Sequence, residues 1–354
     1  MTPDARVAQQ LPNLKLDALI VSALPNIRYL CGFSGSNGLL VLSGNSATLF
    51  TDPRYTIRAA AESSAKVEIV RGSLFGAALK LIDKNRWKRI GFEANRIPYG
   101  SFIELEKSLP GKSSLHPVNG LVEEQRMVKT EIEIGLIRQS VLTNSAAFDT
   151  ALKHLKPSMT ENELAAELEY QMRLHGAEKA AFETIVAAGA HSALPHAQPS
   201  TEVLGANRLL LIDMGAMQAG YASDMTRMLH LGKPGAKARK LYKAVLEAQL
   251  AGIAAVKENT TAGAVDRSTR KVLKEHGYDE FFVHSTGHGL GLEIHEPPRI
   301  GKKDKTVLKA GMVITIEPGA YLEGFGGVRI EDTVLVTKTG CEVLTLTAKE
   351  LIVA

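Results

Sequence analysis

Five residues of types that bind metal ions occur in order along the chain: Asp213, Asp224, His288, Glu317 and Glu331. They stand in the segments IDMG, SDMTR, HSTGHGLGLEIHE, TIEPG and GVRIEDT, each beside an expected strand or turn. Buried carboxylates repel one another and lose hydration, so four of them can share a pocket only if cations are present. If these side chains converge, the sequence predicts a pair of divalent metal ions and a metal-dependent hydrolase.

The donor types indicate which ions to expect. Four carboxylates and one imidazole make a hard, mostly oxygen site, and four negative charges balance two divalent ions. We expect Mn or Co, with Zn or Fe as alternatives, and a water between the two ions that loses its proton readily and attacks a polarised carbonyl. Taken singly, the acids have other interpretations, such as a turn residue for Asp213 or an ion pair with Arg329 for Glu331.

The segment around His288 contains two more histidines, His284 and His295, in a glycine-rich stretch. Glycine allows the backbone to approach an ion or a substrate closely. The HExxH motif is absent, so a thermolysin-like zinc site is not expected. Neither a GxxxxGK[ST] phosphate loop nor a GxSxG elbow occurs, and Cys31 and Cys341 lie in no nucleophile motif, which leaves metal-dependent hydrolysis as the favoured chemistry.

Composition limits the class of protein. The chain has 354 residues, of which 45% are hydrophobic and 23% charged, as in ordinary globular proteins. The 42 basic residues nearly balance the 38 acidic ones, and neither sign forms a long run, so neither nucleic acid nor a membrane is an expected partner. The two cysteines form no disulfide framework, and no signal peptide or apolar run of about 18 residues is evident, which predicts a cytoplasmic protein.

Residues 1–125 are expected to form a separate α/β domain, because short apolar segments alternate with amphipathic ones. Strands are expected at 18–22, 38–43, 47–51, 66–70 and 88–93. Helices are expected between them at 54–62, 75–85 and 99–108. Residues 117–129 are expected to be the linker to a second domain, 126–354.

The sequence of the second domain predicts an internal repeat. Thr130 with Glu133, and Thr160 with Glu163, match the capping-box pattern, so a helix is expected to begin at each pair. A hairpin at 208–231 follows these helices, and the same order continues with helices at 236–257 and 263–276 and a hairpin at 311–337. Helix, helix and hairpin thus occur twice, which predicts an α+β architecture with two facing acidic hairpins about a pseudo-twofold axis.

With these motifs, the chain resembles the pita-bread-fold metallopeptidases, in particular their prolidase and aminopeptidase P branch. In the second domain, the order of the five ligands and the words around them carry the resemblance. In the first domain, LPNIRYLCGFSGSNG followed by TDPRYT is similar to the creatinase-like N-terminal domain of that branch. The resemblance covers nearly the whole chain and implies a pita-bread catalytic domain at 126–354.

The resemblance also implies a role for each ligand. Asp213 would bind one metal ion alone, while Asp224 and Glu331 would bridge both. His288 and Glu317 would complete the second ion, and Glu317 would also handle the proton of a bridging hydroxide. These roles come from the family and not from the spacing of the residues.

Further residues gain a role from the resemblance. His196, in ALPHAQPS, would contact the substrate or its leaving nitrogen. His284 and His295 would line the pocket and stabilise the tetrahedral intermediate. Arg329 would support the neighbouring glutamate ligand. Arg299, in HEPPRI, matches an arginine that binds the free carboxylate of dipeptides in prolidases, whereas without the family it would be a surface arginine.

The implied activity is hydrolysis of the peptide bond before proline. Arg299 favours Xaa-Pro dipeptides, as in a prolidase, and aminopeptidase P activity on longer peptides is the alternative. A non-catalytic binding protein of the same fold is a further alternative, but such relatives lose ligands that are intact here. Methionine aminopeptidases usually lack the N-terminal domain and the HxxxH spacing of His284 and His288. The family also suggests a homodimer.

Overall fold

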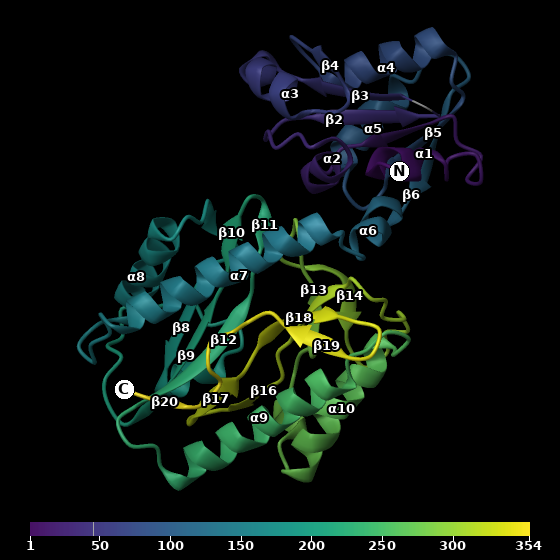
Figure 1. Ribbon diagram of the computed structural model, residues 1–354. Helices are drawn as coiled ribbons and strands as arrows, with labels where there is room; N and C mark the ends of the chain where they lie inside the picture. The colour runs from purple at the N-terminus through teal and green to yellow at the C-terminus, as the bar shows by residue number, and fades with distance from the viewer. Residues whose placement is uncertain (45) are drawn as a thin grey trace. The chain divides into compact units, whose positions relative to one another are not determined.

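The computed structural model describes residues 1–44 and 46–354, and the chain divides into two compact units, Met1–Arg126 and Met127–Ala354 (Figure 1). The first unit is built on a six-stranded mixed sheet in the order β4-β3-β2-β1-β5-β6. Its strands are β1 Ala18–Val21, β2 Leu39–Ser43, β3 Ser46–Thr51, β4 Lys66–Ile69, β5 Arg89–Glu93 and β6 Ser114–Val118. Its helices are α1 Pro3–Ala8, α2 Leu24–Cys31, α3 Thr56–Glu62, α4 Leu74–Asn85, α5 Tyr99–Lys107 and α6 Leu121–Arg126.

Alternation along β1 explains why this sheet has a core on both faces. Leu19 and Val21 pack into one apolar cluster and Ile20 into another, because successive strand residues point to opposite faces. The expected linker differs from the structure, since residues 117–129 contain the end of β6 and the whole of α6. Val122 supplies the reason: it is buried in the same cluster as Leu19 and anchors α6.

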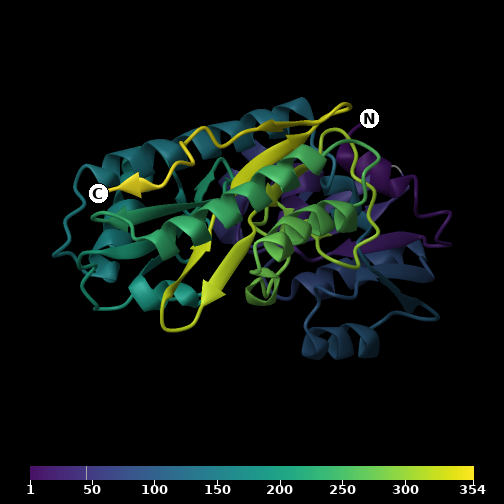
Figure 2. The same cartoon turned by 90° about the horizontal axis from the view of Figure 1, so that it is seen from below.

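The second unit contains two packed pairs of helices. α7 (Glu131–Leu152) packs on α8 (Glu161–Leu174), and α9 (Ala236–Ala255) runs beside α10 (Ala262–Glu275), green in Figure 2. Both expected capping boxes are confirmed: the hydroxyls of Thr130 and Thr160 accept the N–H of Glu133 and Glu163, whose carboxylates accept in return. Among the described helices, none combines the length and apolar character that crossing a membrane requires.

Each helix pair is followed by a hairpin that is split into two segments. In the first, β9 (Arg208–Met214) pairs with β12 (Met225–Leu231), and β10 (Ala216–Gln218) with β11 (Tyr221–Ala222). In the second, β15 (Val313–Ile316) pairs with β18 (Asp332–Val336), and β16 (Gly319–Leu322) with β17 (Gly326–Arg329). The predicted order of helix, helix and hairpin, which occurs twice along the chain, is therefore confirmed.

The longer strand pairs of the two hairpins belong to separate sheets, ordered β20-β12-β9-β8 and β14-β13-β15-β18-β19, while the shorter pairs lie in the sheets β11-β10-β7 and β16-β17. The other strands of this unit are β7 Lys179–Ala180, β8 Ile185–Ala188, β13 Gly287–Gly289, β14 Glu296–Ile300, β19 Cys341–Val343 and β20 Ile352–Val353. Short 3-10 turns occupy η1 Pro53–Tyr55 in the first unit, and η2 Gly189–Ala193 and η3 Asp279–Phe281 in the second.

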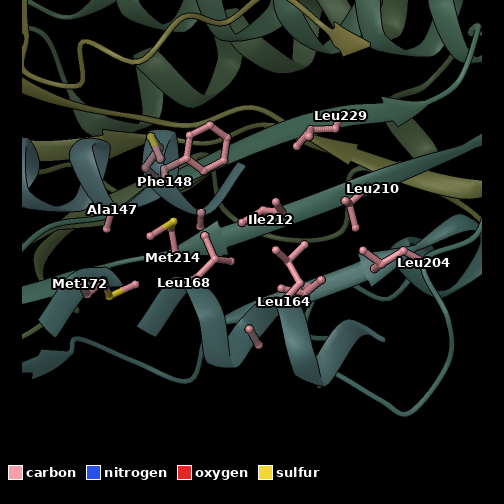
Figure 3. Packing of buried hydrophobic residues seen from close by; sticks show 14 of the residues in the cluster. Ala147, Phe148, Leu164, Leu168, Met172, Leu204, Leu210, Ile212, Met214 and Leu229 are labelled. Carbon is pink, nitrogen blue, oxygen red and sulfur yellow. The ribbon is translucent and has the colours of Figure 1, made fainter. Parts of the chain in front are cut away.

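Strand β9 is apolar on both faces because helices cover both. Leu210 and Ile212 pack with Phe148 of α7 and Leu168 of α8 in one cluster (Figure 3). Leu211 points the other way, into the cluster that includes residues of α9. Burial on both sides makes this strand a rigid support for side chains at its end.

Candidate metal centre and active site

The predicted acids occupy equivalent positions in the two hairpins. In the first, Asp213 lies one residue from the end of β9, and Asp224 directly precedes β12. In the second, Glu317 directly follows β15, and Glu331 directly precedes β18. Each pair therefore stands where its hairpin passes from one pair of strands to the next, so the fold presents two acids from each half.

Hydrogen bonds join the two hairpins next to these acids. The N–H of Glu331 donates to the carbonyl of Thr226 at 3.2 Å, and the hydroxyl of Thr333 donates to the carbonyl of Asp224 at 3.0 Å. Nη1 of the buried Arg227 donates to the carbonyl of Glu331 at 2.6 Å. These contacts cross from β12 to the start of β18 and hold Asp224 beside Glu331.

His288 lies on β13, between β14 and β15. Its backbone N–H donates to the hydroxyl of Thr315 at 3.1 Å, and its Nδ1 lies 2.9 Å from the carbonyl of Gly289. A carbonyl only accepts, so Nδ1 carries the proton and Nε2 is left as a ligand atom. Nε2 lies 3.5 Å from Oδ2 of Asp224 and 3.6 Å from Oε1 of Glu317.

Glycine is required on both sides of His288. A Cβ at Gly287 would lie 2.0 Å from the carbonyl oxygen of Thr315, and one at Gly289 would lie 2.4 Å from that of Pro297. The neighbouring strands approach too closely for any side chain there. This packing is the physical meaning of the glycine-rich segment seen in the sequence.

The carboxylates form a cluster that is electrostatically unfavourable without cations. Burial raises the pKa of Asp224 well above its usual value, and the charges of Asp213 and Glu317 raise it further. Burial, followed by the charge of Asp224, likewise raises the pKa of Glu331. Burial also raises the pKa of Glu317, although His288 and then a nearby arginine oppose this.

Unpartnered oxygens point to the same conclusion. Oδ1 of Asp213 and Oε1 of Glu331 are buried and have no hydrogen-bond partner among the residues that the structure describes. One ligand atom each from Asp224, His288 and Glu331 lie within 4.8 Å of one another. Buried lone pairs of this kind normally have a hydrogen-bond donor or a cation, so the arrangement fits divalent metal ions.

A buried arginine connects candidate metal ligands of the two halves. Nη2 of Arg329 donates to Oδ2 of Asp213 at 2.5 Å, and its Nε donates to the hydroxyl of Thr226 at 3.0 Å. That hydroxyl donates in turn to Oε2 of Glu331 at 2.8 Å. The sequence placed Arg329 beside Glu331; the guanidinium instead pairs with Asp213 and reaches Glu331 through Thr226.

Two residues of this network, Thr226 and Tyr321, were not among the sequence candidates. The sequence does contain a signal for Thr226. It lies two positions after Asp224, and residues two apart on a strand share a face, so it could have been expected beside that acid. Tyr321 accepts from Nη1 of Arg329 at 2.8 Å, and nothing in the sequence around it indicates this contact.

One cavity of about 990 Å³ in the second unit brings all the predicted site residues together. It is lined by the acids and His288, and by His196, His284, His295, Arg299 and Arg329. Its apolar wall includes Phe182, Ile185, Ile294, Pro297 and Pro298. This combination of a few polar groups and an apolar wall is typical of a small-ligand site.

The other histidines of the cavity differ in their contacts. Nδ1 of His284 lies 2.8 Å from the carbonyl of Ser285, and its Nε2 lies 2.8 Å from the hydroxyl of Tyr321, so both ring nitrogens are engaged. Burial, with the positive charge of Arg329 second, lowers the pKa of His284 to about 4. The pKa of His295 is lowered by burial and then by His288, whose ring lies 4.4 Å away between centroids.

Arg299 lies directly opposite His288 in the pairing of β13 with β14. Directly opposed residues of an antiparallel pair place their side chains on the same face, so Arg299 faces the cavity with His288. Its guanidinium makes no hydrogen bond or ion pair within the part of the chain that the structure describes. A cation at a cavity wall without a protein partner is a candidate site for an anionic group.

Comparison with known proteins agrees with this geometry. Residues 135–338 match metallopeptidase family M24, and residues 5–128 match the Creatinase/Prolidase N-terminal domain. An Xaa-Pro dipeptidase of Pyrococcus horikoshii is 39% identical over 98% of this chain and 97% of its own length. A solved Xaa-Pro dipeptidase from Bacillus anthracis superposes with a TM-score of 0.96 at 36% identity, covering 99% of both chains. A solved X-Pro aminopeptidase from Thermotoga maritima superposes with a TM-score of 0.91 at 36% identity, covering 98% of this chain and 100% of that one.

Fold and site together define a metal-dependent hydrolase of the pita-bread type. The chain belongs to metallopeptidase family M24. The fold class and the family expected from the sequence are therefore confirmed, and the family implies divalent metal ions.

Proposed function

We propose that this protein is an Xaa-Pro dipeptidase, which hydrolyses the peptide bond before a C-terminal proline. The observation that carries the proposal is the guanidinium of Arg299, which lies opposite His288 in the same cavity as the acids and has no partner among the described residues. A dipeptide places its free carboxylate one residue from the scissile bond, and a guanidinium binds a carboxylate with two parallel hydrogen bonds. The similarity to Xaa-Pro dipeptidases over nearly the whole chain supports the same activity.

The metal ligands are assigned as follows in this proposal. Asp213 would hold one divalent ion, His288 and Glu317 would hold a second, and Asp224 and Glu331 would serve both. When bound, the ions supply an activated water and polarise the scissile carbonyl. The oxygen-rich donor set suits Mn, Co, Fe or Zn, and of these we propose Mn or Co.

The protein's own groups orient the substrate and move protons. Glu317, whose Oε1 lies 3.6 Å from Nε2 of His288, would handle the proton released by the attacking water. His196 and His295 contact the substrate, since neither ring has a hydrogen-bond partner among the described residues. His284 would stabilise the tetrahedral intermediate only as an imidazolium, because its Nδ1 donates to the carbonyl of Ser285 and the neutral Nε2 can only accept, here from the hydroxyl of Tyr321.

Aminopeptidase P activity on longer peptides is the second candidate. A cavity of about 990 Å³ is large for a dipeptide, and the X-Pro aminopeptidase of Thermotoga maritima is as similar in sequence as the Bacillus anthracis dipeptidase. A binding protein without catalytic activity would have the same fold but would show no turnover.

A turnover assay separates these three candidates. Purified protein is freed of metal with a chelator, reloaded with Mn or Co, and given Xaa-Pro dipeptides and Xaa-Pro-Yaa tripeptides. We expect proline release that chelation abolishes and the metal restores, with higher kcat/KM for the dipeptide. Preference for the tripeptide would establish the second candidate, and absence of metal-dependent turnover on either substrate would sink the enzymatic proposal.

We also propose that the protein acts in the cytoplasm as a homodimer. Both cysteines are free in the structure, which suits a reducing compartment. The dimer follows from the family resemblance, and light scattering of the purified protein tests it directly: a monomeric mass at micromolar concentration would contradict the dimer.

A further inference from the structure

The loop that carries His196 forms one side of the cavity. Five consecutive residues of this loop line it: Pro195, His196, Ala197, Gln198 and Pro199. The His196 side chain is exposed and makes no hydrogen bond or ion pair within residues 1–44 and 46–354. The position of this ring therefore depends on the conformation of the loop backbone.

Both ends of this loop are bound to one buried carboxylate. Glu161, the first residue of α8, is 0% exposed. Its Oε1 accepts the N–H of Ala188 at 2.8 Å, and its Oε2 accepts the N–H and the hydroxyl of Ser200 at 3.0 and 2.7 Å. Nδ1 of His191 lies 2.8 Å from Oε2. Residues 188–200, called here the His196 loop, thus begin and end on the same side chain.

These donors explain why the carboxylate tolerates complete burial. A buried carboxylate is costly unless hydrogen bonds and nearby positive charge replace its hydration, and the N-terminus of α8 adds a favourable field. Moving either end of the loop would leave lone pairs of Glu161 unsatisfied, so the observed conformation is favoured. Within the loop, the N–H of Gly327 donates to the hydroxyl of Ser192 at 2.9 Å, and Arg329 donates to the carbonyl of Pro195 at 3.0 Å.

We propose that Glu161 is a positioning residue for the hydrolysis: by fixing both ends of the His196 loop, its carboxylate places His196 against the substrate. The inference rests on the proposed Xaa-Pro peptidase activity. Glu161 lines no part of the cavity, so it acts through the loop and not by touching the substrate.

A double-mutant cycle tests this role. Glu161→Gln keeps the size of the side chain but replaces one acceptor oxygen with an NH2 donor, which cannot accept from the loop. Because a small misplacement of a reacting or orienting group lowers the rate strongly, we expect kcat/KM for an Xaa-Pro dipeptide to fall by about 10- to 100-fold. The loss should lie mainly in kcat, with metal content unchanged.

The cycle separates positioning from general damage. In a His196→Ala background, Glu161→Gln should cost less than about threefold, since the group that it positions is already gone. Glu163→Gln is the matched control: it makes the same charge change in the same first turn of α8, but among the described residues Glu163 bonds only within its own capping box. It should leave kcat/KM near the wild-type value. If the losses of kcat/KM from the two single variants multiply in the double variant, the proposal is overturned. A loss from Glu163→Gln equal to that from Glu161→Gln would overturn it as well.

Hydrogen exchange provides a readout that needs no substrate. The amides of Ala188 and Ser200 should exchange at least about tenfold faster in Glu161→Gln than in wild type or Glu163→Gln. Unchanged exchange would refute the anchoring of the loop whatever the activity, whereas inactivity of the wild type would remove only the proposed function. If Glu161→Gln does not fold, Ser200→Ala, which removes one of the same bonds, is carried through the same cycle.

Discussion

The hydroxyl of Thr226 donates to Oε2 of Glu331 at 2.8 Å and accepts from Nε of Arg329 at 3.0 Å. Thr226 belongs to β12 of the first hairpin, and Glu331 precedes β18 of the second. Since Arg329 also donates to Asp213, one arginine and one hydroxyl orient an acid from each half of the repeat. Metal ligands commonly require such outer hydrogen bonds to keep their orientation.

Removing this hydroxyl should weaken metal binding. Thr226→Val keeps the shape of the side chain but removes the partner that Oε2 of Glu331 and Nε of Arg329 have in the part of the chain that the structure describes. We expect metal affinity to fall by roughly 10- to 100-fold, as for other outer-shell changes. Isothermal titration of the metal-free protein measures it. Thr226→Ser, which retains the hydroxyl, should stay near wild type; equal affinities for the Val and Ser variants would exclude the orienting role.

Asp224→Asn should have opposite effects on catalysis and on the stability of the metal-free protein. Under the proposed ligand assignment, the variant would lose a ligand that serves both ions, and its activity should fall at least about 100-fold. Asparagine also replaces an acid whose ionised form is disfavoured by burial and by the charges of Asp213 and Glu317, so the chelated variant should be more stable than chelated wild type by roughly 1–3 kcal/mol. Denaturant unfolding and metal analysis measure both effects. Full activity with two metals bound would contradict the bridging role.

The sequence was sufficient to predict where the acids lie in the order of elements, but not which side chains hydrogen-bond to them. Asp213 and Glu317 could be predicted because each lies at an apolar strand and the order of elements repeats. Those features are local. Which hairpin supports which acid depends on packing between segments distant in the chain, so neither the pairing of Arg329 with Asp213 nor the bond of Thr226 to Glu331 could be predicted.

The same limit explains the other differences between expectation and structure. Residues 117–129 were expected to form a linker, but the burial of Val122 holds part of them in α6. Glu161 fits a helix start in the sequence, and only the folded chain brings Ala188 and Ser200 to its carboxylate. Local patterns thus predict elements, while contacts between elements decide which polar groups position the site.

The buried ring of His284 should make stability depend on pH. Burial lowers its pKa from 6.5 to about 4, so between these values the unfolded chain binds a proton that the folded protein does not. The free energy of unfolding should therefore be unaffected by this group above pH 6.5, and it should fall by about 3 kcal/mol as the pH drops to about 4. Unfolding of metal-free wild type and of His284→Gln, which does not titrate, measures this contribution. Parallel curves of stability against pH for the two proteins would rule it out.

Arg299→Ala should distinguish substrates by length. Arg299 faces the cavity opposite His288 and has no protein partner among the described residues, so its removal costs the dipeptide a charge-assisted contact and leaves the fold intact. We expect kcat/KM for Xaa-Pro to fall by about 10- to 100-fold, mainly through KM. An Xaa-Pro-Yaa tripeptide, whose carboxylate lies one residue further along, should lose less. Arg299→Lys keeps the charge but not the paired hydrogen bonds, so it should be intermediate. Equal losses on the two substrates would show that Arg299 does not read the carboxylate of a C-terminal proline, and the aminopeptidase alternative would then be favoured.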